Sequence, residues 1–309
     1  MTFKGFYKNS GFLVQVTMLL VIAIFGAIAS SLLFYIVLIA KGMLAVDTLG
    51  DSTLLYHNPE MFRVMLFFQS LGVFFFPALV LAYLFHDDKN AYLQLNNPSS
   101  FKIALFVFVS MIVVQPFVNL VAELNNMIRL PEFLKAVESW MIGMEEEAQQ
   151  LTESILQADN LLSLLSNIAI VAVVAAVGEE FFFRGVLQQV FRKVFRNEHA
   201  IIWTVAIIFS AVHLQFYGFI PRMLLGAYFG YLLYYTKNLW IPVLAHFTNN
   251  AFGVVGYYFL QNTSNSDFID ALGTGADRWA GVVSFLLWAA FFVLIVKCTK
   301  KGRSPEIIQ

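Results

Sequence analysis

Five ionisable side chains of this 309-residue chain lie deep inside long apolar segments, where charges are costly. They are Glu179, Glu180, Arg184, His213 and His246. A charge at the centre of a bilayer costs about 2.5–3.5 kcal/mol on insertion scales, so such residues need partners and usually mark a functional site. Carboxylates beside imidazoles can activate water, bind a metal ion or relay protons. The sequence therefore predicts a polar site within a membrane.

The spacing of these residues suggests a division of roles. Glu180 and Arg184 are four residues apart, so on a helix they share a face and can pair. A guanidinium can bind a carboxylate through two hydrogen bonds. Glu179 points about 100° away from Glu180 on a helix of 3.6 residues per turn. We expect Arg184 to hold Glu180 and Glu179 to be free to act. His246 and Asn250 are also four residues apart, so both can point at one spot.

Depth in the membrane follows from the rise along each helix. Glu179 lies 13 residues before Arg192, or roughly 20 Å at 1.5 Å per residue. His213 lies 13 residues past the predicted start of its segment at residue 200, again roughly 20 Å. His246 and Asn250 lie six and ten residues past Trp240, or roughly 9 and 15 Å. Three segments thus bring polar groups to similar depths, and the cost of leaving them in lipid implies that they face one another.

These segments belong to a chain with the composition of a membrane protein. Hydrophobic residues make up 59% of it and charged residues 13%, against about 25% charged in soluble proteins. Backbone polar groups in lipid must bond within their own segment, which favours helices. We predict an all-α, polytopic membrane helix bundle of about eight transmembrane helices, with a core of four spans carrying the site. The predicted spans are 11–40, 61–85, 102–124, 161–190, 200–217, 222–236, 240–261 and 279–297.

The organisation along the chain follows from these spans. We predict one integral membrane domain, 1–309, with catalytic core spans at 161–261 and an extracytoplasmic amphipathic helix in the loop 125–160. Segments assigned to the inside hold twice as many basic residues as those assigned to the outside, which places both termini in the cytoplasm. For a bacterial chain the membrane would be the inner membrane. Pro77 and Pro116 fall inside spans, where kinks are expected.

Composition also limits the partners. The formal net charge is −1, which gives no basic footprint for nucleic acid. Cys298 is the only cysteine, so neither an internal disulfide nor a cysteine-based zinc site can form. Arg222 beside Pro221 is interpreted as an interface anchor at the start of a span. The expected partners are the lipid bilayer and a membrane-associated peptide or protein substrate.

Three short motifs carry a resemblance to a known family. The run from Gly178 to Gly185, GEEFFFRG, resembles the EExxxR motif of the CPBP (CAAX protease and bacteriocin-processing, or Abi) family. Phe209 to His213 is similar to its FxxxH motif, and the run HFTNN starting at His246 resembles its HxxxN motif. Their order and internal spacing match. The motifs cover about residues 175–252, roughly a quarter of the chain.

The resemblance implies an intramembrane protease with particular roles for these residues. Glu179 and His213 would position and deprotonate a water for attack on a peptide carbonyl. His246 and Asn250 would stabilise the oxyanion that forms. The carboxylate–guanidinium pair would hold the shape of the site. Preorganised donors in a dry site can contribute roughly 3 kcal/mol each to the transition state.

The role of a metal stays open on the sequence. Glu179, His213 and His246 could form the three-ligand shell of a catalytic zinc ion. The zinc signature HExxH is absent. Both a metal-dependent and a metal-free glutamate mechanism are proposed for the family, so zinc is a candidate cofactor only.

Two other function classes use the same residues. A proton-coupled transporter could employ the Glu and His cluster as a relay, although no inverted repeat is detectable. A non-catalytic immunity or scaffold protein of the same family would keep the cluster for structure alone.

Overall fold

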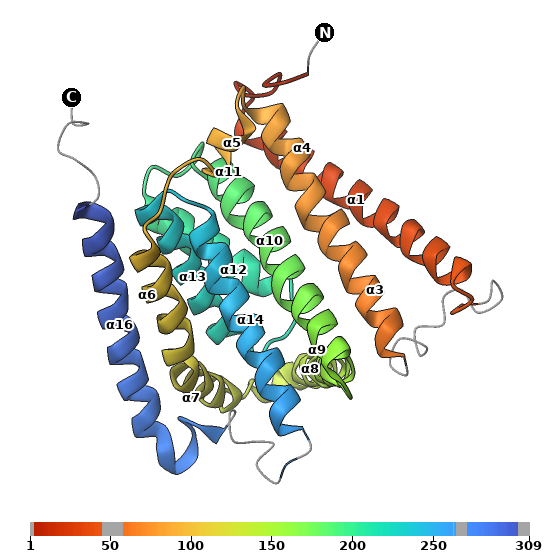
Figure 1. The fold of residues 1–309 in the computed structure, drawn as a ribbon, viewed down its shortest axis with the longest axis vertical. Coiled ribbons are helices and arrows are strands. Elements are labelled where there is room, and N and C mark those ends of the chain that lie inside the picture. The colour runs from red at the N-terminus through yellow and green to blue at the C-terminus, as the bar shows by residue number, and fades with distance from the viewer. Residues whose placement is uncertain (1–2, 45–57, 262, 264–270, 302–309) are drawn as a thin grey trace.

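The structure is a computed structural model that describes residues 3–44, 58–261, 263 and 271–301, and this part of the chain is helical and without strands. Its α-helices are α1 (Phe12–Ala40), α3 (Pro59–Gln69), α4 (Phe76–Phe85), α5 (Lys89–Tyr92), α6 (Phe101–Val113), α7 (Gln115–Asn126), α8 (Lys135–Leu156), α9 (Leu161–Asn167), α10 (Ala175–Glu180), α11 (Gln188–Phe191), α12 (Glu198–Ala211), α13 (Phe219–Thr236), α14 (Trp240–Leu260) and α16 (Arg278–Lys301). Its π-helical segments are η2 (Ser70–Phe75), η4 (Ile168–Val174) and η5 (Phe181–Leu187), and its 3₁₀ turns are η3 (Glu132–Leu134) and η6 (Gly275–Asp277). Figure 1 shows them as a bundle.

The predicted all-α membrane bundle is confirmed. Helices lie in all eight predicted spans. By length and hydropathy, four of the described helices can cross a membrane: Phe12–Ala40, Pro59–Phe85, Leu161–Phe191 and Gly275–Lys300. The bent pair α6 and α7 would make a fifth. The chain is therefore an integral membrane protein, and the count of eight spans stays a prediction.

Polar side chains at the helix starts explain where several helices begin. Asn58 accepts hydrogen bonds from the first-turn amides of α3, which also has Pro59 in its first turn. Asn160 caps α9, and Asn197 caps α12. These side chains satisfy amides that have no partner within the helix. Short polar side chains in the connections thus start helices whose bodies are apolar.

The two prolines behave differently. Pro116 lies in the first turn of α7, and the axis bends by 43° between α6 and α7, as expected for a helix interrupted near proline. Pro77 follows the π-helical segment η2, and the helix Pro59–Phe85 continues as one candidate span. The predicted kink is therefore present at Pro116.

One predicted helix end is wrong. The span predicted at 200–217 ends as a helix at Ala211, six residues earlier. Residues 212–218 form turns, a bend and irregular backbone, and Leu214 adopts a positive φ of 54°, which a right-handed helix does not accommodate. His213 therefore lies beyond the end of α12.

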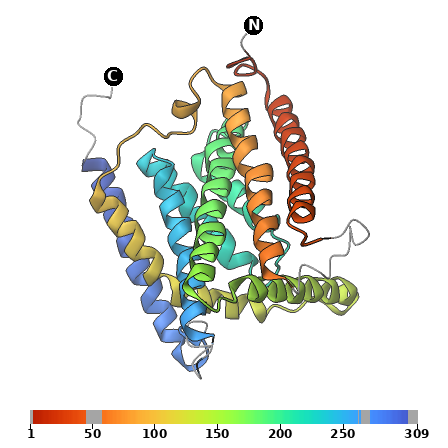
Figure 2. The same ribbon diagram turned by 45° about the vertical axis from the view of Figure 1, so that its right-hand side comes forward.

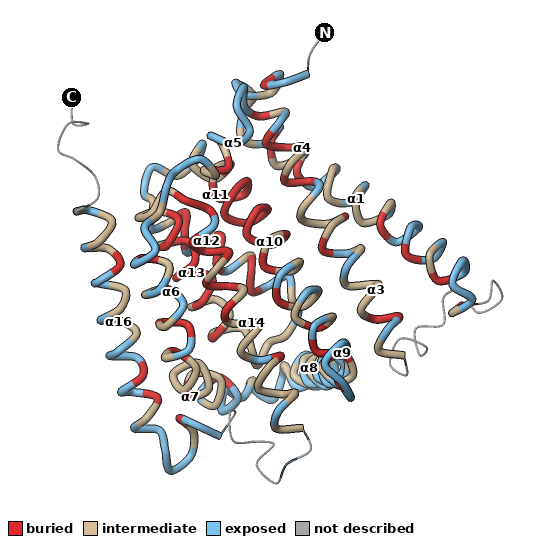
Figure 3. The backbone as a smooth tube through the Cα atoms, in the orientation of Figure 1, coloured by how far each residue is buried: buried red, intermediate tan, exposed pale blue. Residues whose placement is uncertain are grey.

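Buried residues concentrate around the segment that carries the acidic motif. Every side chain from Glu180 to Gln188 is buried, and Figure 3 shows these buried residues along α10 and α11. By contrast α1 and α16 expose large apolar side chains along much of their length, as lipid-facing helices do. Figure 2 shows α8 lying across one end of the bundle. The amphipathic sequence 125–160 thus contains a long helix, and its extracytoplasmic position stays a prediction.

Helix α1 packs against α3, η2 and α4 through close backbone contact. A Cβ added at Gly26 would lie only 1.9 Å from the carbonyl oxygen of Gly72 on η2. Small residues allow helices in membranes to approach this closely. Glycine at position 26 is therefore required for α1 to sit where it does.

Substitution of Gly26 tests this packing. Gly26→Leu should destabilise the protein by about 1–3 kcal/mol, because the new side chain overpacks the contact with Gly72. Gly253→Leu on α14 is the matched control, since a Cβ there meets nothing within 4 Å. Thermal unfolding of the purified protein in detergent measures both. Equal midpoints for the two variants would contradict the contact.

Candidate active site

Four helical regions bring the six predicted site residues together. Glu179 and Glu180 end α10, Arg184 lies in η5, and His213 follows α12. His246 and Asn250 lie on α14, which packs along α10. Contacts join these residues into two groups, which meet at His246.

The first group is a fully buried charge cluster. Glu180 and Arg184 are both 0% exposed. One carboxylate oxygen of Glu180, Oε1, accepts hydrogen bonds from Arg184 Nη1 and from His246 Nδ1, each at 2.8 Å. The predicted pairing of Glu180 with Arg184 is present through one nitrogen of the fork. The other nitrogen, Nη2, donates to the carbonyl of Gly226 at 2.9 Å.

Aromatic rings enclose this cluster. The Arg184 guanidinium lies 4.4 Å from the centroid of the Phe209 ring and 5.4 Å from that of Phe229. Phe229 also stacks on the His246 ring with centroids 5.2 Å apart. Sequence reasoning missed Gly226 and Phe229. The one available signal was the Gly226-x-x-x-Gly230 spacing on α13, which is typical of close helix contacts in membranes.

The second group centres on Glu179. Its Oε2 atom lies 4.0 Å from His213 Nε2 and 3.9 Å from His246 Nε2. This oxygen is buried and has no hydrogen-bond partner among the protein atoms. The two gaps are too long for direct hydrogen bonds but suit a bridging water. The arrangement therefore favours a water molecule held between one carboxylate and two imidazoles.

The hydrogen bonds made by Nδ1 of His213 and of His246 determine the tautomer of each ring, and so the state of the Nε2 atom that faces Glu179. His213 Nδ1 lies 2.8 Å from the backbone carbonyl of Phe209, an acceptor, so Nδ1 must carry the hydrogen. His246 Nδ1 faces the Glu180 carboxylate and donates in the same way. In a neutral ring Nε2 is then the acceptor. When both rings are neutral, three acceptors thus meet at this point, so a water, a second proton on one ring or a cation must lie among them.

The side chain of Asn250 uses part of its hydrogen-bonding capacity within the protein. Its Nδ2 donates to the carbonyl of Val171 at 3.0 Å, and its Oδ1 accepts from Asn249 at 3.2 Å. An amide NH₂ has two hydrogens, so one remains for a ligand. Asn250 lines the same chamber as Glu179 and His213. Its side chain is therefore placed to reach a group bound there.

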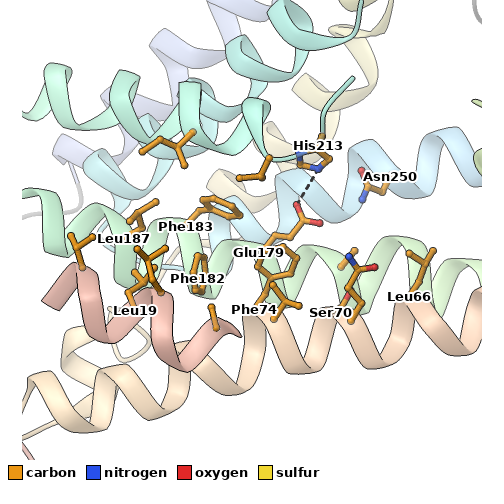
Figure 4. A pocket seen from close by; sticks show the side chains of 18 of the residues that line it. Leu19, Leu66, Ser70, Phe74, Glu179, Phe182, Phe183, Leu187, His213 and Asn250 are labelled. Atoms are coloured by element: carbon orange, nitrogen blue, oxygen red, sulfur yellow. Dashed lines mark ion pairs between the residues drawn. The ribbon is translucent and has the colours of Figure 1, made fainter. Parts of the chain in front are cut away.

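The chamber is large and mostly apolar, with a volume of about 780 Å³. Figure 4 shows Glu179, His213 and Asn250 around it, beside apolar side chains of η5. Further walls come from α1 and from α3 and η2. A concave, largely apolar site with a few convergent polar groups is typical of ligand binding.

The three candidate metal ligands do not fit zinc as they lie. Among the described residues, no group of three or more His, Cys, Asp or Glu has an arrangement that could hold a metal ion. A tetrahedral zinc ion about 2.0–2.2 Å from each ligand would place ligand atoms about 3.3 Å apart. Glu179 Oε2 lies 3.9 Å and 4.0 Å from the two imidazole nitrogens. The spacing fits a hydrogen-bonded water better than zinc.

Comparison with known proteins finds a family whose model matches the segment that carries this site. Residues 161–252, from α9 into α14, match the model of a family described as Type II CAAX prenyl endopeptidase Rce1-like. The match includes all six candidate residues and confirms the resemblance. The uncharacterized protein YpbD of Bacillus subtilis (strain 168) is 31% identical over 91 residues, which cover 28% of this chain and 43% of YpbD. The chain thus spans less than half the length of that relative. No solved structure matches significantly.

Substitutions in the two groups should change stability by very different amounts. Arg184→Met should destabilise the protein by about 3–5 kcal/mol, because it leaves Glu180 buried without its cation. Glu179→Gln removes the charge of a residue whose Oε2 has no protein partner, so it should change stability by less than about 1 kcal/mol. Thermal unfolding in detergent measures both variants. A wild-type midpoint for Arg184→Met would refute the structural role of the pair.

Proposed function

We propose that this chain is an intramembrane endopeptidase, because residues 161–252 match the model of the Rce1-like family of type II CAAX prenyl endopeptidases. Its substrate would be a membrane-associated peptide or protein. The observation that carries the proposal is the convergence of Glu179, His213 and His246 on one point at the wall of an apolar chamber. A lipid-facing or purely structural cluster would not need two imidazoles directed at a carboxylate oxygen without a protein partner.

The geometry supports a water activated by Glu179. A water between Glu179 Oε2 and His213 Nε2 can donate to both, which orients its oxygen lone pairs toward a bound carbonyl. As the water attacks, its proton passes to Glu179, which can then deliver it to the leaving amine. Phe209 fixes the His213 tautomer throughout by accepting from Nδ1.

His246 and Asn250 would stabilise the developing oxyanion. Glu180 accepts from Nδ1 of His246, as a carboxylate does in a catalytic triad, and so stabilises a ring protonated on both nitrogens. Nε2–H of that ring would donate to the oxyanion, together with the second amide hydrogen of Asn250. Arg184 keeps Glu180 in place and offsets its charge. Each donor lost should cost roughly 100- to 1,000-fold in kcat.

Alanine variants at the reacting positions test the proposal. Glu179→Ala and His213→Ala should each abolish cleavage while the protein still inserts and folds. Glu132→Gln is a matched surface control, since that carboxylate is 91% exposed. The measurement compares the membrane proteomes of cells that carry wild-type or variant protein, supplemented by purified protein acting on an internally quenched, farnesylated CAAX peptide.

The outcomes separate the function classes. Substrates that accumulate only in the Glu179→Ala and His213→Ala cells support the protease. Normal cleavage by either variant refutes the mechanism. Alanine variants that keep full biological activity without any cleavage would indicate a non-catalytic role, and proton-coupled uptake by liposomes containing the protein would indicate a transporter.

Chelation tests the metal question separately. Because the ligand spacing fits water better than zinc, cleavage should survive dialysis against a zinc chelator to within about twofold. Loss of activity on chelation, with recovery on adding zinc, would contradict the metal-free form of the proposal and leave Glu179, His213 and His246 as the metal ligands.

A further inference from the structure

His213 has an unusual support for a residue at a reacting centre. It lies outside a helix, in the segment 212–218, and its own backbone N–H makes only a long, 3.3 Å bond to Ser210. The next residue, Leu214, adopts a positive φ, a conformation that residues other than glycine rarely take. The segment must therefore be held by contacts from other elements, or His213 would not stay opposite Glu179.

Helices α7 and α8 hold the far half of this segment. Asn125 Nδ2 donates to the carbonyls of Phe216 and Tyr217, at 3.0 and 2.7 Å. The Glu145 carboxylate accepts from the Tyr217 N–H at 3.1 Å. Trp140 packs on the Phe216 ring, with centroids 5.2 Å apart. None of these contacts reaches the residues directly after His213.

Arg222, in the first turns of α13, holds the near half. Its Nη2 donates to the Gln215 side chain at 2.5 Å. A Cβ added at Gly218 would lie 3.3 Å from the same nitrogen, so the guanidinium lies against the backbone there. Nη1 of Arg222 is buried without a hydrogen-bond partner. The guanidinium is therefore directed against the turn that carries His213, and its role as an interface anchor stays a prediction.

The positive charge of Arg222 also acts on the carboxylate of Glu179. Arg184 forms its ion pair with Glu180, and no Lys or Arg of the described residues forms one with Glu179. Arg222 interacts electrostatically with Glu179, which lines the membrane chamber, and with Glu145, which lines a separate polar cleft of about 710 Å³ beside α8. An uncompensated buried charge is strongly destabilising, so these two carboxylates help to explain why the Arg222 guanidinium, whose hydrogen bond within the described part of the chain goes to the neutral Gln215 amide, is tolerated.

We propose that Arg222 is a positioning residue that keeps His213 opposite Glu179 by bracing the 212–218 segment through Gln215. This inference rests on the proposed function only for its effect on cleavage. The Arg222–Gln215 hydrogen bond, called the brace below, is a property of the fold and does not depend on the reaction. Misplacement of a reacting group by about 1 Å can cost roughly 100-fold in rate, so a single hydrogen bond at this point has a large effect.

The test uses two variants that break the brace from opposite ends. Arg222→Met and Gln215→Leu should each lower kcat on the farnesylated peptide by roughly 10- to 100-fold, with KM unchanged within about twofold. The double variant should be no worse than Arg222→Met alone, because both remove one interaction. Arg222→Lys, which keeps a donor and the charge, should recover most of the rate. Arg129→Met is the control, since Arg129 donates to the carbonyl of Asn126, at the end of the preceding helix, and not to the 212–218 segment as far as the described residues show.

A second readout does not depend on proteolysis. Diethyl pyrocarbonate modifies accessible imidazoles, and mass spectrometry then gives the rate for each histidine. The rate at His213 should rise at least threefold in Arg222→Met and Gln215→Leu, while His199, which bonds to Tyr231 away from the segment, stays constant as the internal reference.

The outcomes decide the proposal whether or not the chain cleaves the peptide. Faster His213 labelling in both variants supports the brace even if the wild-type protein shows no protease activity, which would count against the proposed function alone. Unchanged His213 labelling overturns the brace, including the case in which cleavage falls. Additive losses in the double variant would also overturn it, because Arg222 and Gln215 would then act independently.

Discussion

Hydrocarbon cannot solvate ions, and this one constraint organises the structure. The buried carboxylate of Glu180 is tolerated because one of its oxygens accepts from both Arg184 and His246 at 2.8 Å. The same bonds fix the orientation of His246 and leave its Nε2 facing Glu179. The ion pair that makes a charge tolerable in hydrocarbon therefore also directs an imidazole at Glu179, the proposed general base. Aromatic rings and the carbonyl of Gly226 complete the enclosure of the guanidinium.

The backbone around this pairing departs from regular α-helix. Glu179 and Glu180 lie in a short α-helical stretch between two π-helical segments, η4 and η5. Segments of π-helix are rare and frequently occur at functional sites. His213 leaves its helix altogether and is oriented by a carbonyl at the end of α12. The site thus combines a rigid, buried charge pair with a histidine whose position depends on contacts from α7, α8 and α13.

Much of the site could be predicted, because the cost of burying a charge and the spacing of residues along a helix can both be read from a short stretch of sequence. The cost of burying charge singles out the five ionisable residues, and spacing of four along a helix predicts the bond between Glu180 and Arg184. Helix ends, π-helical segments and long-range partners depend on tertiary contacts that no local pattern encodes. The end of α12 before His213 was missed for this reason. The sequence places Arg222 near a span end but does not show its contact with Gln215, because that contact depends on the fold of the 212–218 segment.

The most direct test is an experimental structure at a resolution that shows ordered water. The account predicts one solvent peak at about 2.8 Å from Glu179 Oε2, within hydrogen-bond distance of an imidazole nitrogen, in a chamber continuous with the apolar cavity. Side chains of residues 179, 213 and 246 directed to separate places, with no chamber joining them, would contradict the hydrolase assignment.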